Sequence, residues 1–355
     1  MAQEIVLITG ATGHLGFHVL QYALDHGLAV RAAVRSQAKA DILKSHITVN
    51  NKQKDSRLSF VVVPDFGAPG AFDDAVKAAT YIIHCASPIP MSAPTTDSAE
   101  MEFIAPAVQA TLGILESDSK VESVRRIVIT SSCIAVAPVA AAFSDTGETY
   151  TANTRQPEID GPFPPGTPSF VAYAAGKVAA LNRAETWIRN ENPSFDVIHL
   201  MPSYVLGRNG MCDGLERLQT STNSIPLNII LGQDGNETPM SMVVNHVDDC
   251  ARIHVEALHP RIEGGQSFMI CYDCSTEPKW DRAKEVVAKH FPELIKTGFL
   301  KNDGTLKSVH CSLESAKTEE IFGFRHSYDE AVVDIVQQYL ELRKKEEENK
   351  NRVKD

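Results

Sequence analysis

Short apolar runs along the first two hundred residues alternate with stretches of mixed polarity. Each run has the length of a strand, and most of the intervening stretches are long enough for a helix. Strands that are apolar at nearly every position are typical of a parallel sheet covered by helices on both faces. The pattern therefore predicts a doubly wound α/β fold of the Rossmann type, with strands over residues 4–9, 29–34, 58–63, 81–86, 126–130 and 196–200.

Beyond Pro202 the pattern becomes irregular and indicates a second, smaller domain that binds substrate. Loops are expected over 207–214 and 232–239, a short strand and a helix over 243–258, a strand over 267–270, and helices over 279–290 and 328–343. The predicted nucleotide-binding domain is therefore 1–201 with 241–260 returning to it. The substrate-binding domain is predicted from 202–240 and 261–345, followed by a charged, solvated tail over 346–355.

A glycine-rich segment follows the first strand and opens the first helix. Gly10 permits a tight turn, Gly13 lets the backbone approach a pyrophosphate at the helix N-terminus, and Gly16 lets helix and strand pack closely. A glycine triplet is a weak signal alone, but its place between a strand and a helix is the context that dinucleotide binding requires.

A single Tyr-x-x-x-Lys pattern, formed by Tyr173 and Lys177, lies well downstream of this turn. Residues four apart on a helix share one face, so the lysine's charge can lower the pKa of the phenol and make it a usable proton donor. Ser131 and Ser132 end an earlier strand, where a hydroxyl can hold a carbonyl oxygen. Together these parts predict a carbonyl reductase.

A proline-rich segment over 156–169 separates the serines from the tyrosine. Its five prolines and two glycines exclude a helix or a central strand. Because the segment leads directly into the helix of Tyr173, we expect it to border the substrate pocket, although a plain surface connection is an equal alternative.

The residues after the second strand decide which dinucleotide is favoured. An acidic side chain there would bind the ribose hydroxyl of NAD, whereas a cationic one accommodates the 2′-phosphate of NADP. Residues 30–39 contain no acid, and Arg35 and Lys39 are the predicted phosphate contacts. Asp65, beyond the third strand, is a candidate contact to the adenine, with a turn-forming role as the alternative.

Composition and net charge limit the classes of molecule that the protein is expected to bind. The chain has 355 residues, 43% of them hydrophobic, and a formal net charge of −11, which argues against nucleic acid or an anionic membrane as partner. The N-terminus lacks a signal-peptide pattern, and seven scattered cysteines suit reduced thiols. We therefore expect a cytoplasmic monomer or homodimer without a metal, and interpret Cys271-x-x-Cys274 as incidental rather than a zinc or redox motif.

In seven segments the chain resembles the extended short-chain dehydrogenase/reductase superfamily, and within it the dihydroflavonol, cinnamoyl-CoA and methylglyoxal reductase group. The resemblance spans residues 5 to about 258 and rests on ITGATGHLG, VRAAVRSQAK, YIIHCASP, IVITSS, YAAGK, MPSYVLGRN and NHVDDCARIHVEAL.

This resemblance implies roles for individual residues. Ser132 matches the serine that polarises the carbonyl, Tyr173 the proton donor, and Lys177 the residue that orients the cofactor and lowers the tyrosine pKa. The implied reaction is NADPH-dependent reduction of an aldehyde or ketone. Combined with the motif analysis, the expected NADPH contacts besides Tyr173 and Lys177 are Thr9, Gly10, Thr12, Gly13, His14, Leu15, Gly16, Arg35, Lys39, Asp65, Phe66, Cys85, Ala86, Ser87, Thr130, Pro202, Ser203 and Val205.

Two departures from the group concern the substrate rather than the reaction. Met201 stands where an arginine often precedes the proline, and the proline-rich segment lengthens the connection between Ser132 and Tyr173. His84, Cys133 and His246 neighbour motif residues, and we assign them structural roles. The alternatives are a sugar-nucleotide epimerase or dehydratase with tightly held NAD(P), and a non-catalytic regulator that senses dinucleotides.

Overall fold

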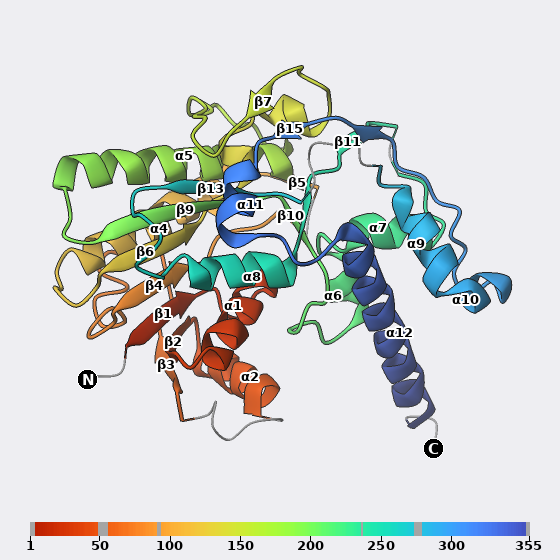
Figure 1. Cartoon of the computed structure of the whole chain (residues 1–355), viewed down its shortest axis with the longest axis horizontal. Helices are drawn as coiled ribbons and strands as arrows, with labels where there is room; N and C mark the ends of the chain where they lie inside the picture. The colour runs from red at the N-terminus through yellow and green to blue at the C-terminus, as the bar shows by residue number, and fades with distance from the viewer. Residues whose placement is uncertain (1–3, 49–55, 91–93, 236, 273–278, 353–355) are drawn as a thin grey trace.

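A seven-stranded parallel sheet forms the centre of the molecule (Figure 1). The structure is a computed structural model that describes residues 4–48, 56–90, 94–235, 237–272 and 279–352. The strand order is β13-β9-β6-β4-β1-β2-β3, which confirms the doubly wound fold. The strands are β1 (Ile5–Thr9), β2 (Ala29–Val34), β3 (Leu58–Val62), β4 (Tyr81–His84), β6 (Arg126–Thr130), β9 (Asp196–Pro202) and β13 (Ser267–Ile270).

Strand β1 is the point at which the chain reverses its direction of travel across the sheet. It pairs with β2 on one side and β4 on the other, so that Thr9 lies opposite both Ala33 and His84. In open parallel sheets, ligands bind outside the carboxyl ends of the strands at such a switch point. The fold therefore places the candidate site beside Thr9.

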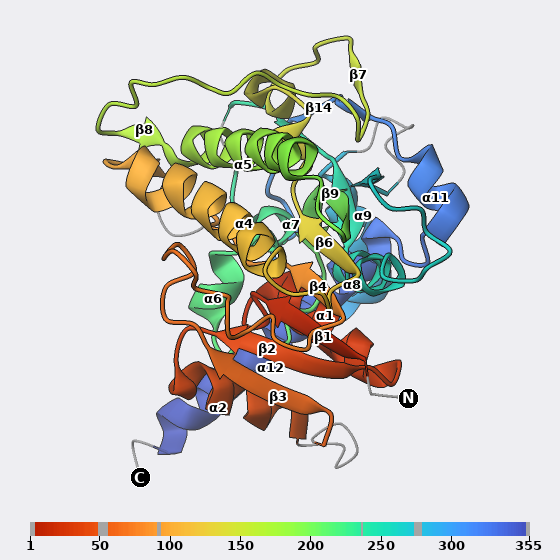
Figure 2. The same ribbon diagram turned by 90° about the vertical axis from the view of Figure 1, so that its left-hand side faces the viewer.

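Helices cover both faces of the sheet (Figure 2). Val6 and Ile8 pack in one core with residues of α1 (His14–Asp25), α2 (Gln37–Thr48) and α8 (Val247–Glu256). Leu7 points to the opposite face and packs in a core with α4 (Ala105–Asp118) and α5 (Ser169–Glu191). Alternation of side chains along β1 thus explains why the strand is apolar at successive positions.

A second core lies outside the sheet and centres on Trp280, which is fully buried. It joins β10 (Tyr204–Leu206), β12 (Val244–His246), α6 (Leu215–Gln219), α7 (Ser224–Ile230), α9 (Arg282–His290) and α12 (Tyr328–Arg352). The remaining elements are β5 (Thr95–Thr96), η1 (Glu100–Ile104), η2 (Cys133–Ala135), η3 (Val139–Ala142), β7 (Thr149–Tyr150), β8 (Thr167–Pro168), β11 (Met240–Ser241), α10 (Pro292–Lys296), β14 (Ser308–Val309), β15 (Ser312–Leu313) and α11 (Ala316–Phe322).

Three expectations need correction. Strand β13 pairs with β9 in the central sheet, although residues from 261 onward were assigned to the substrate-binding domain. The charged end of the chain is helical through Arg352 rather than a separate tail, and Arg343 lies 3.6 Å from Glu347 one turn later. Cys271 is disulfide-bonded rather than reduced, whereas Cys274 lies outside the described residues.

A helix that spans a bilayer must be long and predominantly apolar. Within the residues that the structure describes, no helix is both long and apolar enough to cross a membrane.

Candidate active site at the carboxyl edge of the sheet

The glycine turn between β1 and α1 is held by close backbone contacts. Gly10 has a φ of +74°, and a Cβ there would lie 2.7 Å from the backbone nitrogen of Ala86. A Cβ at Gly16 would overlap the carbonyl of Gly10. The predicted reasons for glycine at positions 10 and 16 are therefore confirmed, and Gly13 precedes the open N-terminus of α1.

Thr9 joins this turn to the end of β4. Its hydroxyl lies 2.9 Å from Nδ1 of His84 and accepts a hydrogen bond from the backbone N–H of Ala86 at 3.2 Å. Burial lowers the pKa of His84 to about 3, so the imidazole is neutral. The contact with Thr9 agrees with the structural role that we assigned to His84, which stays a prediction.

The part of the chain that surrounds the Trp280 core, called the second lobe below, reaches the same turn. Nε2 of His14 lies 3.2 Å from the carbonyl oxygen of Arg208, and the Arg217 guanidinium donates to the carbonyl oxygen of Thr12 at 3.2 Å. Burial lowers the pKa of His14 to about 3, and that imidazole is neutral as well. The glycine turn just before Leu15 is therefore in contact with residues of the second lobe.

The predicted phosphate contacts lie beyond β2. Arg35 and Lys39 are both exposed, and the Arg35 guanidinium lies 5.8 Å from the centre of the Phe66 ring. Asp65 accepts a hydrogen bond from the backbone N–H of Gly67 at 2.8 Å, so its turn-forming role is present. Its contact to adenine stays a prediction.

Ser132 and Tyr173 come together from different elements. Ser132 lies two residues beyond the end of β6 and accepts a 3.4 Å hydrogen bond from the backbone N–H of Ile134, while Tyr173 lies in the second turn of α5. Burial raises the pKa of Tyr173 to about 12, and a hydrogen bond with the Ser132 side chain only partly offsets this effect. The expected lowering of the tyrosine pKa by Lys177 is therefore wrong for the protein alone.

Lys177 lies one turn farther along α5, with its ammonium 5.9 Å from the centre of the Tyr173 ring. The residue is only 6% exposed and donates a hydrogen bond of 3.1 Å to the carbonyl oxygen of Thr130. Burial lowers the pKa of Lys177 to about 8, and Lys177 is not among the groups that shift the pKa of Tyr173. The lysine, rather than the tyrosine, carries the pKa nearest neutrality.

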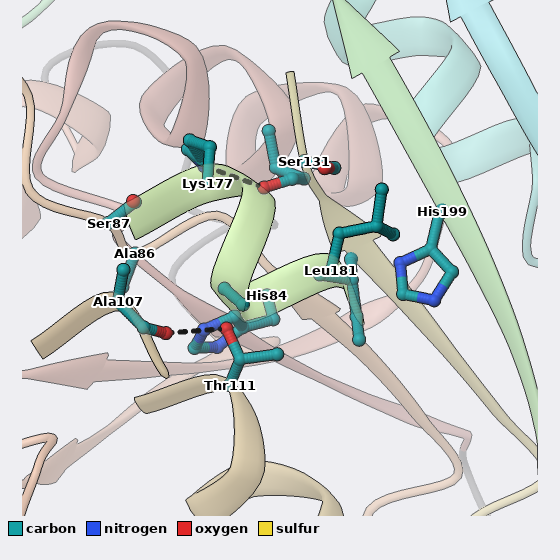
Figure 3. A pocket seen from close by; sticks show the side chains of 12 residues that line it. His84, Ala86, Ser87, Ala107, Thr111, Ser131, Lys177, Leu181 and His199 are labelled. Atoms are coloured by element: carbon teal, nitrogen blue, oxygen red, sulfur yellow. Dashed lines mark hydrogen bonds between the residues drawn. The ribbon is translucent and has the colours of Figure 1, made fainter. Parts of the chain in front are cut away.

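A cavity beside Lys177 brings together several predicted cofactor contacts (Figure 3). Among the described residues, Nε2 of His84, Oγ of Ser131 and both ring nitrogens of His199 are buried there without a hydrogen-bond partner. Sequence reasoning missed His199, because an imidazole inside a central strand has no motif around it. The lining residues are His84, Ala86, Ser87, Ala107, Thr111, Ile129, Thr130, Ser131, Lys177, Ala180, Leu181 and His199.

The predicted nicotinamide-binding segment follows β9. The hydroxyl of Ser203 donates to the carbonyl oxygen of Ile270 at 3.0 Å, and Nδ2 of Asn245 donates to the carbonyl oxygen of Ser203 at 3.2 Å. The Ser203 side chain therefore fixes the path of the chain between Pro202 and Val205. Cys85, which directly follows β4, is partly buried, and burial raises the pKa of its thiol to about 11.

The proline-rich segment lies near the tyrosine. Phe163 and Tyr173 both pack against a small cluster formed by Ala99, Phe103 and Ala172. Strand β8, within the segment, pairs with β5, so the end of the segment is anchored to another loop. These contacts agree with a place beside the substrate pocket, which stays a prediction.

A second apolar cluster lies near Tyr173. Tyr204, Cys133 and Cys311 are partly buried against one apolar cluster that includes Met201. Burial raises the pKa of Tyr204, with smaller contributions from Cys133 and Tyr173. Cys311 comes from the second lobe, and no motif surrounds it in the sequence.

Three comparisons bear on this geometry. The model of the NAD dependent epimerase/dehydratase family matches residues 6–271. Ketoreductase CTB6 of Cercospora nicotianae is 42% identical over 98% of each chain, and the NAD-dependent epimerase/dehydratase ALT6 of Alternaria alternata is 32% identical over 90% of this chain and 93% of its own. The yeast methylglyoxal/isovaleraldehyde reductase Gre2, solved with NADPH, shares the fold with a TM-score of 0.77, at 23% identity over 96% of this chain and 99% of Gre2.

Proposed function

Because the chain belongs to the NAD dependent epimerase/dehydratase family, we propose that it is an NADPH-dependent reductase that converts an aldehyde or ketone to the alcohol. The family match agrees with the resemblance to extended short-chain dehydrogenases/reductases. The observation that carries the proposal is the convergence of Ser132, Tyr173 and Lys177 beside the glycine turn. The 42% identity to a ketoreductase supports the same reaction class.

The residues present fit a dinucleotide. The glycine turn leaves no room for side chains at positions 10 and 16, and the open N-terminus of α1 suits a pyrophosphate. Arg35 and Lys39 are the cations that would hold the 2′-phosphate, and Lys177 would hold the nicotinamide ribose. When bound, NADPH supplies the hydride that reaches the carbonyl carbon.

The protein's own residues handle the oxygen atom and its proton. Ser132 donates a hydrogen bond to the carbonyl oxygen and stabilises the negative charge that develops there. Tyr173 gives this oxygen its proton, and the pKa of about 12 keeps the phenol protonated throughout the neutral range. Lys177, with its pKa near 8, supplies a positive charge below that pH.

The similarity to ALT6, named an epimerase/dehydratase, supports a second candidate in which NAD(P) is held tightly and is regenerated within each turnover. Denaturing the purified protein and analysing the released nucleotide separates the two functions. A stoichiometric amount of retained NAD would favour the second candidate. A cofactor-free protein that consumes NADPH only with a carbonyl compound would favour the reductase.

The direct test is a panel of aldehydes, diketones, aromatic ketones and flavanonols assayed for NADPH consumption. Product analysis should show the alcohol in equal amount to the NADPH oxidised. Tyr173→Phe is the matched control, because it removes the proton donor and keeps the ring. If no carbonyl compound supports turnover while NADPH binds, the reductase proposal is wrong.

A further inference from the structure

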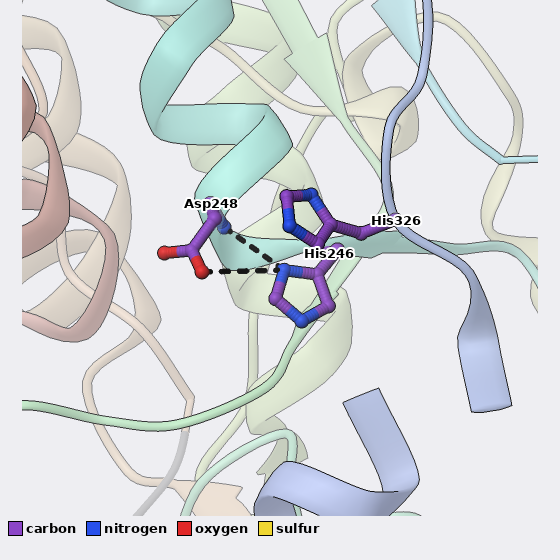
Figure 4. Close-up of side chains that lie close together, drawn as sticks. All are labelled: His246, Asp248 and His326. Atoms are coloured by element: carbon purple, nitrogen blue, oxygen red, sulfur yellow. Dashed lines mark hydrogen bonds and ion pairs between the residues drawn. The ribbon is translucent and has the colours of Figure 1, made fainter. Parts of the chain in front are cut away.

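Two histidines and an aspartate meet at the junction of the two lobes (Figure 4). His246 ends β12, Asp248 lies in the first turn of α8, and His326 precedes α12. The candidate ligand atoms of these residues all lie within 4.8 Å of one another. The imidazole rings of His246 and His326 are stacked with their centres 4.5 Å apart.

The three side chains differ in exposure. That of His246 is 2% exposed and so is fixed by its surroundings, whereas those of Asp248 and His326 are 49% and 34% exposed. One ligand is therefore positioned in advance, and the other two can rotate toward it. Their exposure also gives an ion a path from solvent.

Each of the three side chains has an ionisable side chain near the atom that would face away from the metal. Nδ1 of His326 lies 3.3 Å from Oδ2 of Asp249, and Nε2 of His246 lies 3.6 Å from Oδ2 of Asp334. His18 Nδ1 contacts Oδ1 of Asp248 at 2.7 Å, which leaves Oδ2 directed to His246. In protein metal sites, a carboxylate commonly lies beside the nitrogen of a histidine that does not bind the metal.

The charge of the surroundings also favours a cation. Asp248, Asp249 and Asp334 are close to the two histidines. The buried Arg252 bonds Asp249 at 2.8 Å and offsets its charge, so Asp248 and Asp334 carry the attraction for a cation. Histidine nitrogen with one carboxylate oxygen is a donor set typical of zinc and related divalent ions.

We propose that His246, Asp248 and His326 form a binding site for one divalent transition-metal ion, with Zn²⁺ as the expected occupant. Neighbouring ligand atoms in a tetrahedral zinc site are about 3.4 Å apart, given metal–ligand distances of about 2.1 Å. The three groups must therefore approach one another by roughly an ångström, through rotation of Asp248 and His326. Nδ1 of His246 would exchange its 3.2 Å hydrogen bond with the Asp248 N–H for the metal.

Binding would join the lobes directly. Asp248 belongs to a helix that packs on α1 of the sheet domain, whereas His326 leads into α12 of the second core. A ligand bound only by the folded protein stabilises it in proportion to the logarithm of its concentration over Kd. The site thus offers metal-dependent attachment of α12, independent of the proposed reduction.

The test uses the tag-free full chain, stripped with a chelator and titrated with Co²⁺ as a spectroscopic probe and with Zn²⁺ by calorimetry. We expect one ion per chain, a cobalt absorption spectrum of nitrogen and oxygen ligands, and an increase in Tm. His326→Gln and Asp248→Asn should each weaken binding by at least about 10-fold, because even the loss of a group that only orients a ligand typically costs about 10- to 100-fold. His290→Gln, at an exposed histidine of α9, is the matched control and should bind as the wild type.

A thiolate-to-cobalt charge-transfer band would place the ion on cysteine and overturn the proposal. The proposal is also overturned if neither His326→Gln nor Asp248→Asn weakens binding, or if both weaken it no more than the control His290→Gln does. Both test variants change partly exposed side chains, and their Tm in chelator shows whether they fold. A variant that does not fold is replaced by His246→Gln, which removes the ligand fixed in advance.

Discussion

Lys177 donates a hydrogen bond of 3.1 Å to the carbonyl oxygen of Thr130, and this bond ties the middle of α5 to the carboxyl end of β6. Because Ser132 follows that strand and Tyr173 precedes the lysine by one turn, the bond fixes the spacing of the proposed proton donor and carbonyl-binding serine. The same burial that orients the ammonium lowers its pKa to about 8.

The pH dependence of catalysis should therefore reflect Lys177. Below pH 8 the ammonium is charged and supports cofactor binding, and above this pH the charge is lost, so kcat/KM for NADPH should fall as pH rises through about 8. The phenol, with a pKa of about 12, should not titrate in this range. Lys177→Met should lower kcat/KM and remove the step near pH 8. An unchanged step in that variant would assign it to another group.

The pKa of Lys177 also predicts how stability varies with pH. In the folded protein the lysine releases its proton near pH 8, whereas in the unfolded chain it keeps it to about 10.5. Between these values the unfolded chain binds more protons, so this residue's contribution to the free energy of unfolding increases with pH. Urea unfolding of wild type and Lys177→Met at pH 7 and pH 9.5 measures the difference, which should be absent from the variant.

Tyr173→Phe should reduce kcat by about 10² to 10⁴-fold, because general acid catalysis contributes that much. NADPH affinity, measured by fluorescence titration, should stay nearly unchanged because the ring still packs against Phe103 and its neighbours. Full activity in this variant would remove Tyr173 from the mechanism.

Arg35→Ala should reduce NADPH affinity by about 10- to 100-fold, as expected for a charge-assisted hydrogen bond to the 2′-phosphate worth about 1.5–3 kcal/mol. NADH use should change much less, because NADH lacks that phosphate. Lys289→Ala, at an exposed lysine of α9, serves as the control for a general loss of positive charge. The measurement is kcat/KM for both cofactors. An unaltered preference in Arg35→Ala would contradict the role of Arg35.

Phe163→Ala should alter KM for the carbonyl substrate and leave NADPH affinity unchanged. The reason is that Phe163 packs on the same cluster as Tyr173, on a segment that we place at the substrate pocket. Glu158→Ala is the matched variant on the same segment, because Glu158 pairs with Arg183 at 2.8 Å on α5. Equal effects of the two changes would indicate loosening of the segment rather than lost substrate contact.

Gly176→Ala should destabilise the protein by about 1 kcal/mol. A Cβ there would lie 2.9 Å from the carbonyl oxygen of Phe103 in η1, and overpacking costs roughly 1–3 kcal/mol, while alanine returns about 1 kcal/mol of helix propensity. Gly214→Ala is the control, because a Cβ at Gly214 meets no atom within 4 Å. Differential scanning calorimetry should show a lower Tm only for the first variant.

The central sheet and helix α5 could be predicted because their signals are local. Apolar strands, the turn at Gly10 and the four-residue spacing of Tyr173 and Lys177 each depend on adjacent sequence. The seventh strand was assigned to the wrong domain because nothing in Ser267–Ile270 shows that it pairs with β9. Pairing between distant strands depends on how the whole chain is packed.

The electrostatic error at Tyr173 has a different origin. Spacing along a helix places a charge near the phenol, but it does not say how much water both groups lose on folding. Here burial outweighs the charge and raises the tyrosine pKa. His199 was missed because it reaches the cavity from a strand that carries no motif.

The close approach of Gly10 to the backbone at Ala86 limits how this enzyme can be re-engineered. The backbone of the turn at Gly10 and the backbone just after β4 are in van der Waals contact, so neither can change its path unless the other moves too. In a chimera that takes only the first strand, turn and helix from a relative to alter cofactor preference, the new turn would face the original backbone at Ala86. That turn would be adapted to the relative's own backbone at this position. The exchangeable unit is the turn together with residues 84–87, and these two segments should be transferred as one module.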